Sequence, residues 1–229
     1  MKIEKQLKEH ANNLIRTFQY QDEFVIDAND SFPEPWITEN ALMCLVYLAE
    51  NEGKKALSLY QKLKNQYQEG ELYKYKPSYE DISIPGSIVM GLPAVALGHK
   101  SQAEKIYSEI NKIFHSNKYL EDYLFNISAR ALLDYALKNK LHSYALEQLK
   151  EFENQSGLYR NLKTQETISL HSNALAIILL GLFDKKEALK KAEKLLAIKS
   201  SDIQDQVAVA FMCLALTEKK FGDLKFEFS

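Results

Sequence analysis

The sequence predicts an all-α protein built from repeated helical hairpins. Three observations support this fold class. Glycine and proline are scarce, with 8 and 5 residues in a chain of 229, whereas the tight turns of a β-rich chain would require more of both. Segments that are apolar on nearly every side alternate with segments that are apolar on one side only. This alternation repeats at an interval above 40 residues, which indicates an internal structural repeat.

The first kind of segment predicts buried inner helices. The stretch from Thr38 to Glu50 contains an uninterrupted apolar run, from Ala41 to Ala49. Four later stretches have the same character, at residues 87–97, 127–137, 173–183 and 207–216. A helix that is apolar all round must be packed on all sides. A buried strand is the competing interpretation, but the length of the runs, their Ala and Leu content and the lack of alternation favour helix.

The second kind of segment predicts outer helices with one apolar face. Ala56, Tyr60 and Leu63 follow the spacing i, i+4 and i+7, which places them on one side of a helix. The same spacing returns in three later segments, which start at Ala103, Ala145 and Ala188. These four alanines are separated by 47, 42 and 43 residues. Each repeat is therefore expected to be one inner helix, a short turn and one outer helix.

We expect a single all-α domain over residues 1–229, with hairpins at 38–67, 85–115, 120–154 and 167–198. A helix over residues 1–20 and a last inner helix over 201–219 remain without a partner in these hairpins. If the first helix packs on the last, the hairpins close into a ring, an (α/α)5–6 toroid. The alternative is an open α-solenoid, which needs the same hairpins but caps both ends with polar faces.

The repeat resembles two known families to different degrees. The stretch from Ala49 through Gly53, Ala56, Tyr60 and Leu63 resembles the second half of a tetratricopeptide hairpin, but that family repeats at about 34 residues. The longer period found here resembles instead the α/α-toroid proteins: six-hairpin glycosidases, sugar epimerases, polysaccharide lyases and terpenoid cyclases. This resemblance covers almost the whole chain and is architectural. The Asp-rich and Gln-Trp signatures of the cyclases are absent, so no catalytic residue follows from it.

Composition excludes several kinds of partner. Lys and Arg number 29 against 31 Asp and Glu, and no stretch gathers five like charges, so we expect neither nucleic-acid nor membrane binding. The N-terminus is charged and no apolar run approaches about 20 residues. Together with Cys44 and Cys213, which lie in apolar runs as reduced thiols would, these features predict a cytoplasmic protein. The sequence leaves open a protein partner or a homo-oligomer.

No motif indicates a metal or a cofactor. The chain has no HExxH, no Cys/His ligand spacing, no GxGxxG, no phosphate-binding loop and no GxSxG element. We therefore expect neither a bound metal nor a cofactor. In a ring of hairpins, the segments that enter the inner helices meet at one end, and here these segments combine aromatic residues with carboxylates and amides.

Five residues at or near the inner-helix entrances are the candidates for catalysis: Asp30, Glu39, Asp81, Asp205 and His171. Two carboxylates at a suitable separation carry out glycosyl chemistry through an oxocarbenium-like transition state. A histidine can transfer protons near neutral pH. The alternative for the acidic residues is a favourable interaction with the positive end of a helix dipole, and for the histidine a structural hydrogen bond.

Eight residues are candidates for ligand binding: Trp36, Asn40, Tyr79, Tyr123, Arg130, Tyr159, Asn173 and Gln206. Trp36, the only tryptophan, either stacks on a ligand or plugs the end of the ring. Asn40 and Asn173 each begin an Asn-Ala-Leu run and are also suited to a helix start. Arg130 lies inside an apolar helix, so it either faces a cavity or pairs with Asp134 one turn later.

Three functions are consistent with these features. The first is a carbohydrate-active or sugar-binding toroid with a pocket at the rim where the inner helices begin; as an enzyme it would be a glycoside hydrolase, a lyase or an epimerase-like protein. The second is a non-catalytic helical-repeat module that binds a protein or a peptide in an open groove. The third is a hydrophobic cavity of the terpenoid type, which would need an aromatic-lined ring interior.

Overall fold

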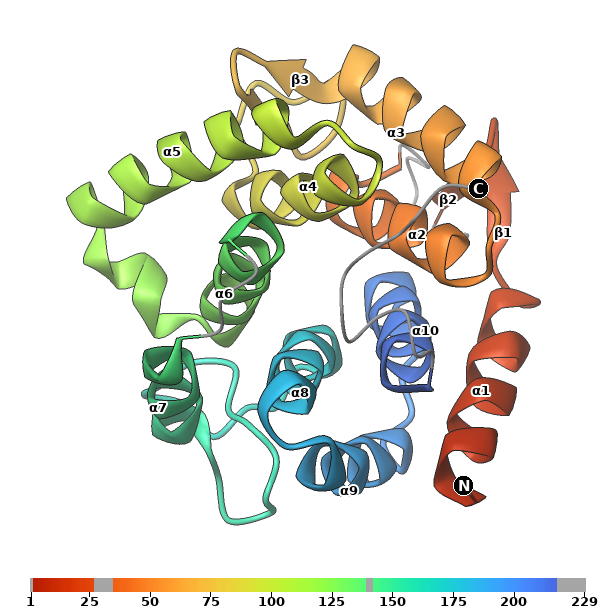
Figure 1. Ribbon diagram of the computed structural model, residues 1–229, viewed down its shortest axis with the longest axis vertical. Helices are drawn as coiled ribbons and strands as arrows, with labels where there is room; N and C mark the ends of the chain where they lie inside the picture. The colour runs from red at the N-terminus through yellow and green to blue at the C-terminus, as the bar shows by residue number, and fades with distance from the viewer. Residues whose placement is uncertain (1, 27–34, 139–141, 218–229) are drawn as a thin grey trace.

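The structure, a computed structural model, describes residues 2–26, 35–138 and 142–217 of the chain. Within these ranges ten α-helices form two layers (Figure 1). The inner helices are α2 (Ile37–Ala49), α4 (Ile84–Ala96), α6 (Leu124–Lys138), α8 (Leu170–Phe183) and α10 (Ile203–Thr217). The outer helices are α1 (Lys2–Ile15), α3 (Gly53–Tyr67), α5 (Lys100–Ser116), α7 (Ser143–Phe152) and α9 (Lys185–Leu196). A short 3-10 helix, η1 (Lys118–Asp122), precedes α6.

The inner helices close into a ring. Each packs on the next along the chain, and α10 also packs on α2 (Figure 1). Helix α1, at the start of the chain, packs on α10 and takes the position of its outer partner. The all-α hairpin fold is thereby confirmed, with five inner–outer pairs in the described residues. The contact between α10 and α2 rules out the open solenoid.

Burial explains the two classes of helix. In α2 every residue except Tyr47 is buried, and in α8 the whole stretch from Ser172 to Leu180 is buried. By contrast, α3 buries one stripe only, at Ala56, Leu59, Tyr60, Leu63 and Tyr67. An apolar helix contacts neighbours on all sides, whereas an amphipathic helix buries one face and keeps the other in water.

The prediction that residues 1–20 form one helix is wrong at its C-terminal end. Helix α1 stops at Ile15, and the chain continues into a hairpin of β1 (Gln19–Gln21) and β2 (Phe24–Ile26). A second small hairpin joins β3 (Gln68–Glu69) and β4 (Leu72–Tyr73). The turn of the first hairpin places Asp22 and Glu23 at φ values of 50° and 76°. It escaped prediction because such turns are usually marked by glycine.

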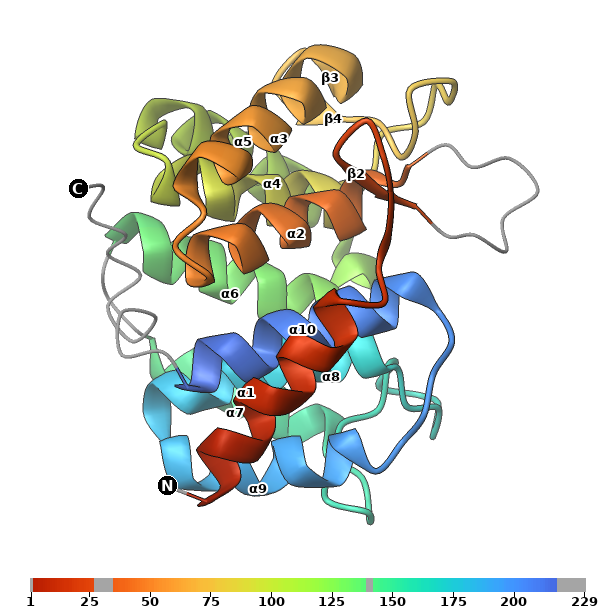
Figure 2. The same cartoon turned by 90° about the vertical axis from the view of Figure 1, so that its right-hand side faces the viewer.

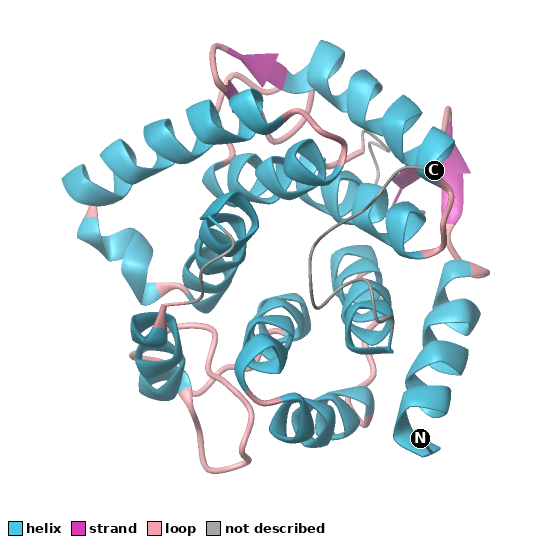
Figure 3. Ribbon diagram, viewed as in Figure 1, coloured by secondary structure: helices cyan, strands magenta, loops and turns pink. Residues whose placement is uncertain are grey.

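The longer connections gather at one end of the ring. Figure 2 shows β2, β4 and the loop that precedes α8 on the same side of the molecule, and Figure 3 shows that helices make up almost all the rest. Within the described ranges no helix is long and apolar enough to cross a bilayer. Cys44 and Cys213 are buried free thiols, and burial raises the pKa of both.

Candidate functional site

A cavity of about 490 Å³ lies where the five inner helices begin. The second residue of each inner helix lines it: Thr38, Pro85, Phe125, His171 and Gln204. Consecutive repeats therefore present the same helical position to one shared space. We call this space the rim cavity. Its place agrees with the end of the ring at which the sequence predicted a site.

An aromatic cluster forms one wall of the rim cavity. Trp36, which directly precedes α2, lines the cavity together with Tyr75. The edges of Tyr75 and Tyr79 approach the Trp36 ring at centroid distances of 6.2 and 6.1 Å. The buried ammonium group of Lys76 lies 4.4 Å from the centroid of the Trp36 ring, a favourable cation–π arrangement. These contacts hold Trp36 in the cavity wall, and Tyr79 supports Trp36 from outside the lining.

A second aromatic pair comes from the segment before α6. The rings of Tyr119 and Tyr123 meet edge to face at 5.3 Å, and both line the rim cavity. The hydroxyl of Tyr123 donates a hydrogen bond of 3.2 Å to that of Tyr119. This hydrogen bond, with a smaller effect of burial, raises the pKa of Tyr123. The remaining polar lining consists of Thr38, Glu39, Asn126, Asn161, His171, Ser172 and Gln204.

Two ionisable side chains of the lining lie in the first turns of inner helices. Glu39 lies in the first turn of α2 and is only 6% exposed. His171 lies in the first turn of α8, and its Nδ1 is 2.9 Å from Oδ1 of Asp205 on α10. Asp205 does not line the rim cavity and contacts it only through His171. Among the described lining residues Glu39 is the only carboxylate, so the pair of cavity carboxylates expected from the sequence is not assembled from the described part of the chain.

The charge state of Asp205 follows from its hydrogen bonds. Burial alone would raise its pKa, but hydrogen bonds from the His171 ring, from Ser200 Oγ and from the His171 main-chain N–H outweigh burial. The pKa of Asp205 is therefore lowered from its ordinary value of 3.8. A lowered pKa in the folded state means that ionised Asp205 stabilises the fold.

We expect this stabilisation to disappear in acid. The stabilisation is fully present above the ordinary pKa of an aspartate, about 4, and is lost as the pH falls through the lower pKa that Asp205 has in the folded state. The difference in unfolding free energy between the wild type and Asp205→Asn should accordingly shrink between pH 7 and pH 3. Urea denaturation at both pH values measures this difference. An unchanged difference would contradict the assigned charge state.

Asn40 and Asn173 were predicted to bind ligand, and the structure corrects this. Both side chains are fully buried and outside the rim-cavity lining. The amide of Asn173 accepts from the main-chain N–H of Tyr159 at 2.8 Å and donates to its carbonyl oxygen at 2.8 Å. Asn40 makes the same two bonds to Val25, at 2.7 and 3.0 Å. Each asparagine therefore fixes the extended chain that leads back to its own helix.

The same arrangement recurs in α4 with a shorter side chain. Ser87 Oγ accepts from the main-chain N–H of Tyr73 at 2.9 Å and faces its carbonyl oxygen at 3.4 Å. Asn40, Ser87 and Asn173 are each the fourth residue of an inner helix. Successive residues turn by about 100° around a helix axis, so the second and fourth positions face opposite ways. The side chain at the fourth position thus bonds to the main chain that enters the helix, and the side chain at the second position lines the rim cavity.

Four other predicted residues lie away from the rim cavity. Arg130 hydrogen-bonds to Asn111 at 3.0 Å and pairs with Glu121 at 3.5 Å. It therefore does not line the rim cavity, and its ion pair is with Glu121 and not with Asp134. Tyr159 is buried beneath the ammonium group of Lys191. The remaining two are Asp81, which is exposed, and Gln206, which donates to Ser200 O at 3.2 Å. Asp30 lies outside the described residues.

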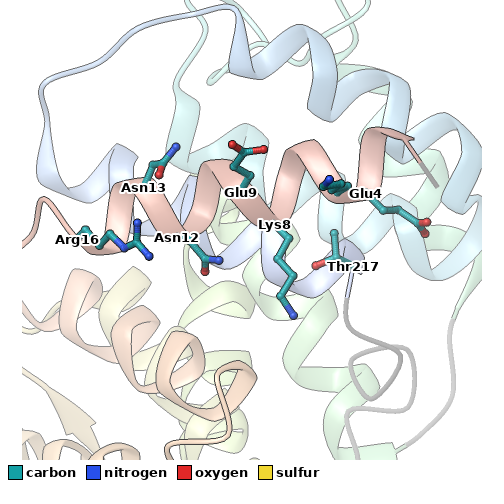
Figure 4. Close-up of a pocket in the computed structure, with 8 residues that line it drawn as sticks. Glu4, Lys8, Glu9, Asn12, Asn13, Arg16 and Thr217 are labelled. Carbon is teal, nitrogen blue, oxygen red and sulfur yellow. The ribbon is translucent and has the colours of Figure 1, made fainter.

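Two other hollows differ in chemistry. One of about 690 Å³ runs along the polar face of α1 (Figure 4), where Glu4, Lys8, Glu9 and Arg16 mix both signs of charge without an aromatic residue in the lining. The other, of about 310 Å³, lies between α1, α9 and α10 and is mainly apolar, with Gln206 in its wall. The rim cavity alone among these three combines aromatic rings with amides, a carboxylate and an imidazole.

Of the predicted residues, Trp36, Glu39, Tyr123 and His171 are brought together in the rim cavity. Residues that line the rim cavity but were not among the predicted site residues include Thr38, Phe125, Asn126, Ser172 and Gln204. Their shared signal is the second or third position of an inner helix. That signal becomes usable only when each helix start is known to within one residue, and sequence patterns do not give starts that closely.

The closed ring of inner helices with outer partners is an α/α-toroid fold. No protein-family model matches the sequence, and no curated protein is similar to it at the sequence level.

Two solved structures share the fold. An endo-β-1,4-glucanase from Acetobacter xylinum aligns with a TM-score of 0.59 and 8% identity, over 92% of this chain and 97% of that chain. An α-amylase from Clostridium perfringens aligns with a TM-score of 0.57 and 11% identity, over 91% of this chain and 97% of that chain. At these identities the likeness concerns the fold alone.

Proposed function

We propose that the rim cavity binds a carbohydrate and carries out acid–base chemistry on it. The observation that carries this proposal is the convergence of all five inner-helix starts on one cavity with an aromatic wall and several hydrogen-bonding side chains. Aromatic rings stack on the C–H faces of sugars, while amides, hydroxyls and carboxylates bind sugar hydroxyls. Its volume, about 490 Å³, falls within the range of about 300–1,000 Å³ usual for small-molecule sites.

The similar structures support the same proposal, since one is named a glucanase and the other an amylase. The competing function, a groove for a protein or peptide, would need the concave face of an open array. Packing of α10 on α2 closes that face. A terpenoid-type cavity would need an aromatic-lined hollow deep between the inner helices, whereas the rim cavity lies where these helices begin.

We further propose a cytoplasmic protein, because two buried cysteines that are free thiols suit a reducing compartment.

A panel of mono- and oligosaccharides, read by thermal shift, tests the proposed function. Binding to the native state raises stability by RT ln(1 + [L]/Kd), which is about 2.7 kcal/mol at a concentration of 100 Kd. We expect at least one sugar to raise the melting temperature of the wild type. Trp36→Ala should abolish this rise because it removes the stacking surface.

Tyr144→Ala serves as the matched control, since Tyr144 is an aromatic residue 62% exposed on the outer helix α7. This variant should keep the full response to the sugar. If no sugar in the panel stabilises the wild type, or if Trp36→Ala responds as the wild type does, the proposed function is wrong.

A further inference from the structure

The hydrogen bonds around His171 determine which of its ring nitrogens carries the proton. Oδ1 of Asp205 lies 2.9 Å from His171 Nδ1 and also accepts from the His171 main-chain N–H at 3.0 Å. Oδ2 of the same carboxylate accepts from Ser200 Oγ at 2.8 Å. The carboxylate thus has donors on both oxygens, and its position relative to the imidazole is fixed from α8 and from the loop before α10.

An ionised carboxylate can only accept hydrogen bonds. The lowered pKa of Asp205 keeps it ionised at neutral pH. Nδ1 of His171 must therefore carry the proton that points to Oδ1, because two lone pairs at 2.9 Å would repel each other. A neutral imidazole carries one proton, so Nε2 is left with a free lone pair.

The neighbouring serines agree with this assignment. Ser169 Oγ lies 3.1 and 3.2 Å from the two ring nitrogens of His171. Ser169 Oγ donates to Ser172 Oγ at 3.0 Å, and Ser172 Oγ in turn donates to Asn161 Oδ1 at 2.8 Å. These hydrogen bonds run from Ser169 to Asn161 and not toward the imidazole ring. Should Ser169 instead donate to Nε2, that nitrogen would still be the acceptor.

We propose that His171 Nε2 is the proton acceptor of the rim cavity and that Asp205 is the positioning residue that fixes this tautomer. The inference rests on the proposed function and adds a reaction class to it, proton transfer from a carbohydrate hydroxyl to an imidazole. The O–H bond breaks, its electron pair remains on the oxygen, and the proton moves to Nε2. Asp205 then balances the charge of the imidazolium. The base at this cavity is thus the imidazole, with Glu39 the only carboxylate among the described lining residues.

Nitrogen-15 NMR of histidine-labelled protein at neutral pH tests the tautomer directly. The wild type should show His171 with its proton on Nδ1. In Asp205→Ala the ratio of the Nδ1–H to the Nε2–H form should fall about tenfold or more, as expected for loss of a hydrogen bond to a charged group. Asp205→Asn, which keeps a neutral acceptor, should lie between the two. It also provides a readout if the alanine variant does not fold.

Ser200→Ala is the matched control, because it removes the hydrogen bond to Oδ2 and leaves Oδ1 facing His171. It should retain the wild-type tautomer. A wild-type proton on Nε2, or the same tautomer in Asp205→Ala as in the wild type, would overturn the inference.

Diethyl pyrocarbonate separates this inference from the proposed function. The free lone pair of Nε2 attacks a carbonyl carbon of the reagent, and ethyl carbonate leaves with the electron pair of the broken C–O bond. Peptide mass spectrometry should show His171 modified more slowly in Asp205→Ala than in the wild type, with the exposed His115 as internal reference. Cellobiose and maltose serve as the protecting probes. If neither protects His171 while the NMR tautomer is as expected, the carbohydrate assignment fails; if the tautomer differs, the inference fails.

Discussion

Replacing Asn173 with alanine is expected to lower the free energy of unfolding by about 3 kcal/mol, because it leaves two buried main-chain groups without partners. The N–H and the carbonyl oxygen of Tyr159 both bond to the Asn173 amide at 2.8 Å. Tyr159 itself is 3% exposed, so water does not replace these bonds freely. Urea denaturation monitored by circular dichroism measures the loss.

Asn65→Ala is the control for this variant, since Asn65 is exposed on the outer helix α3. Its effect should stay within about 0.5 kcal/mol, as for most surface substitutions. A stable Asn173→Ala variant that had lost sugar binding would contradict the structural role and return Asn173 to the ligand-binding residues.

The second large effect is expected at Leu7, which is fully buried on α1. Leu7→Ala should lower the free energy of unfolding by about 3 kcal/mol through lost burial and the cavity left behind. Because α1 packs on α10 and α10 packs on α2, the loss of stability should extend from α1 to both of these inner helices. Hydrogen exchange should accordingly speed up in α10 and α2 as well as in α1.

Lys5→Ala, at an exposed position of the same helix, provides the comparison and should change stability little. In an open array, the terminal helix would fray alone, with faster exchange confined to α1. That outcome would contradict the ring closure.

Much of the fold was predictable because its signals are local in the chain. The spacing of Ala56, Tyr60 and Leu63 predicted an outer helix at 53–67, and α3 spans Gly53–Tyr67. The inner helices were equally predictable, since α2 contains the apolar run from Ala41 to Ala49. The short β1–β2 hairpin was missed because Asp22 and Glu23 form its turn without a glycine.

The residues that line the rim cavity were predictable only in part. Trp36 and Glu39 were recognised because an aromatic and a carboxylate at an inner-helix entrance suit a rim. Asn40 was assigned to the ligand although it is one residue further along the helix. One residue is a turn of about 100°, enough to move a side chain from the rim cavity into the wall of the ring.

The sequence by itself determined the hairpins, because the periodicity of apolar residues within each segment sets which helix face is buried. It also determined which end of the ring carries aromatic and polar residues. The tertiary structure decided how each inner helix is rotated about its axis. This rotation turns the second residue of the helix toward the rim cavity and the fourth residue toward the chain that enters the helix. It also joined His171 to Asp205, 34 residues apart in the chain. Such pairings arise from packing between helices and leave no local pattern in the sequence.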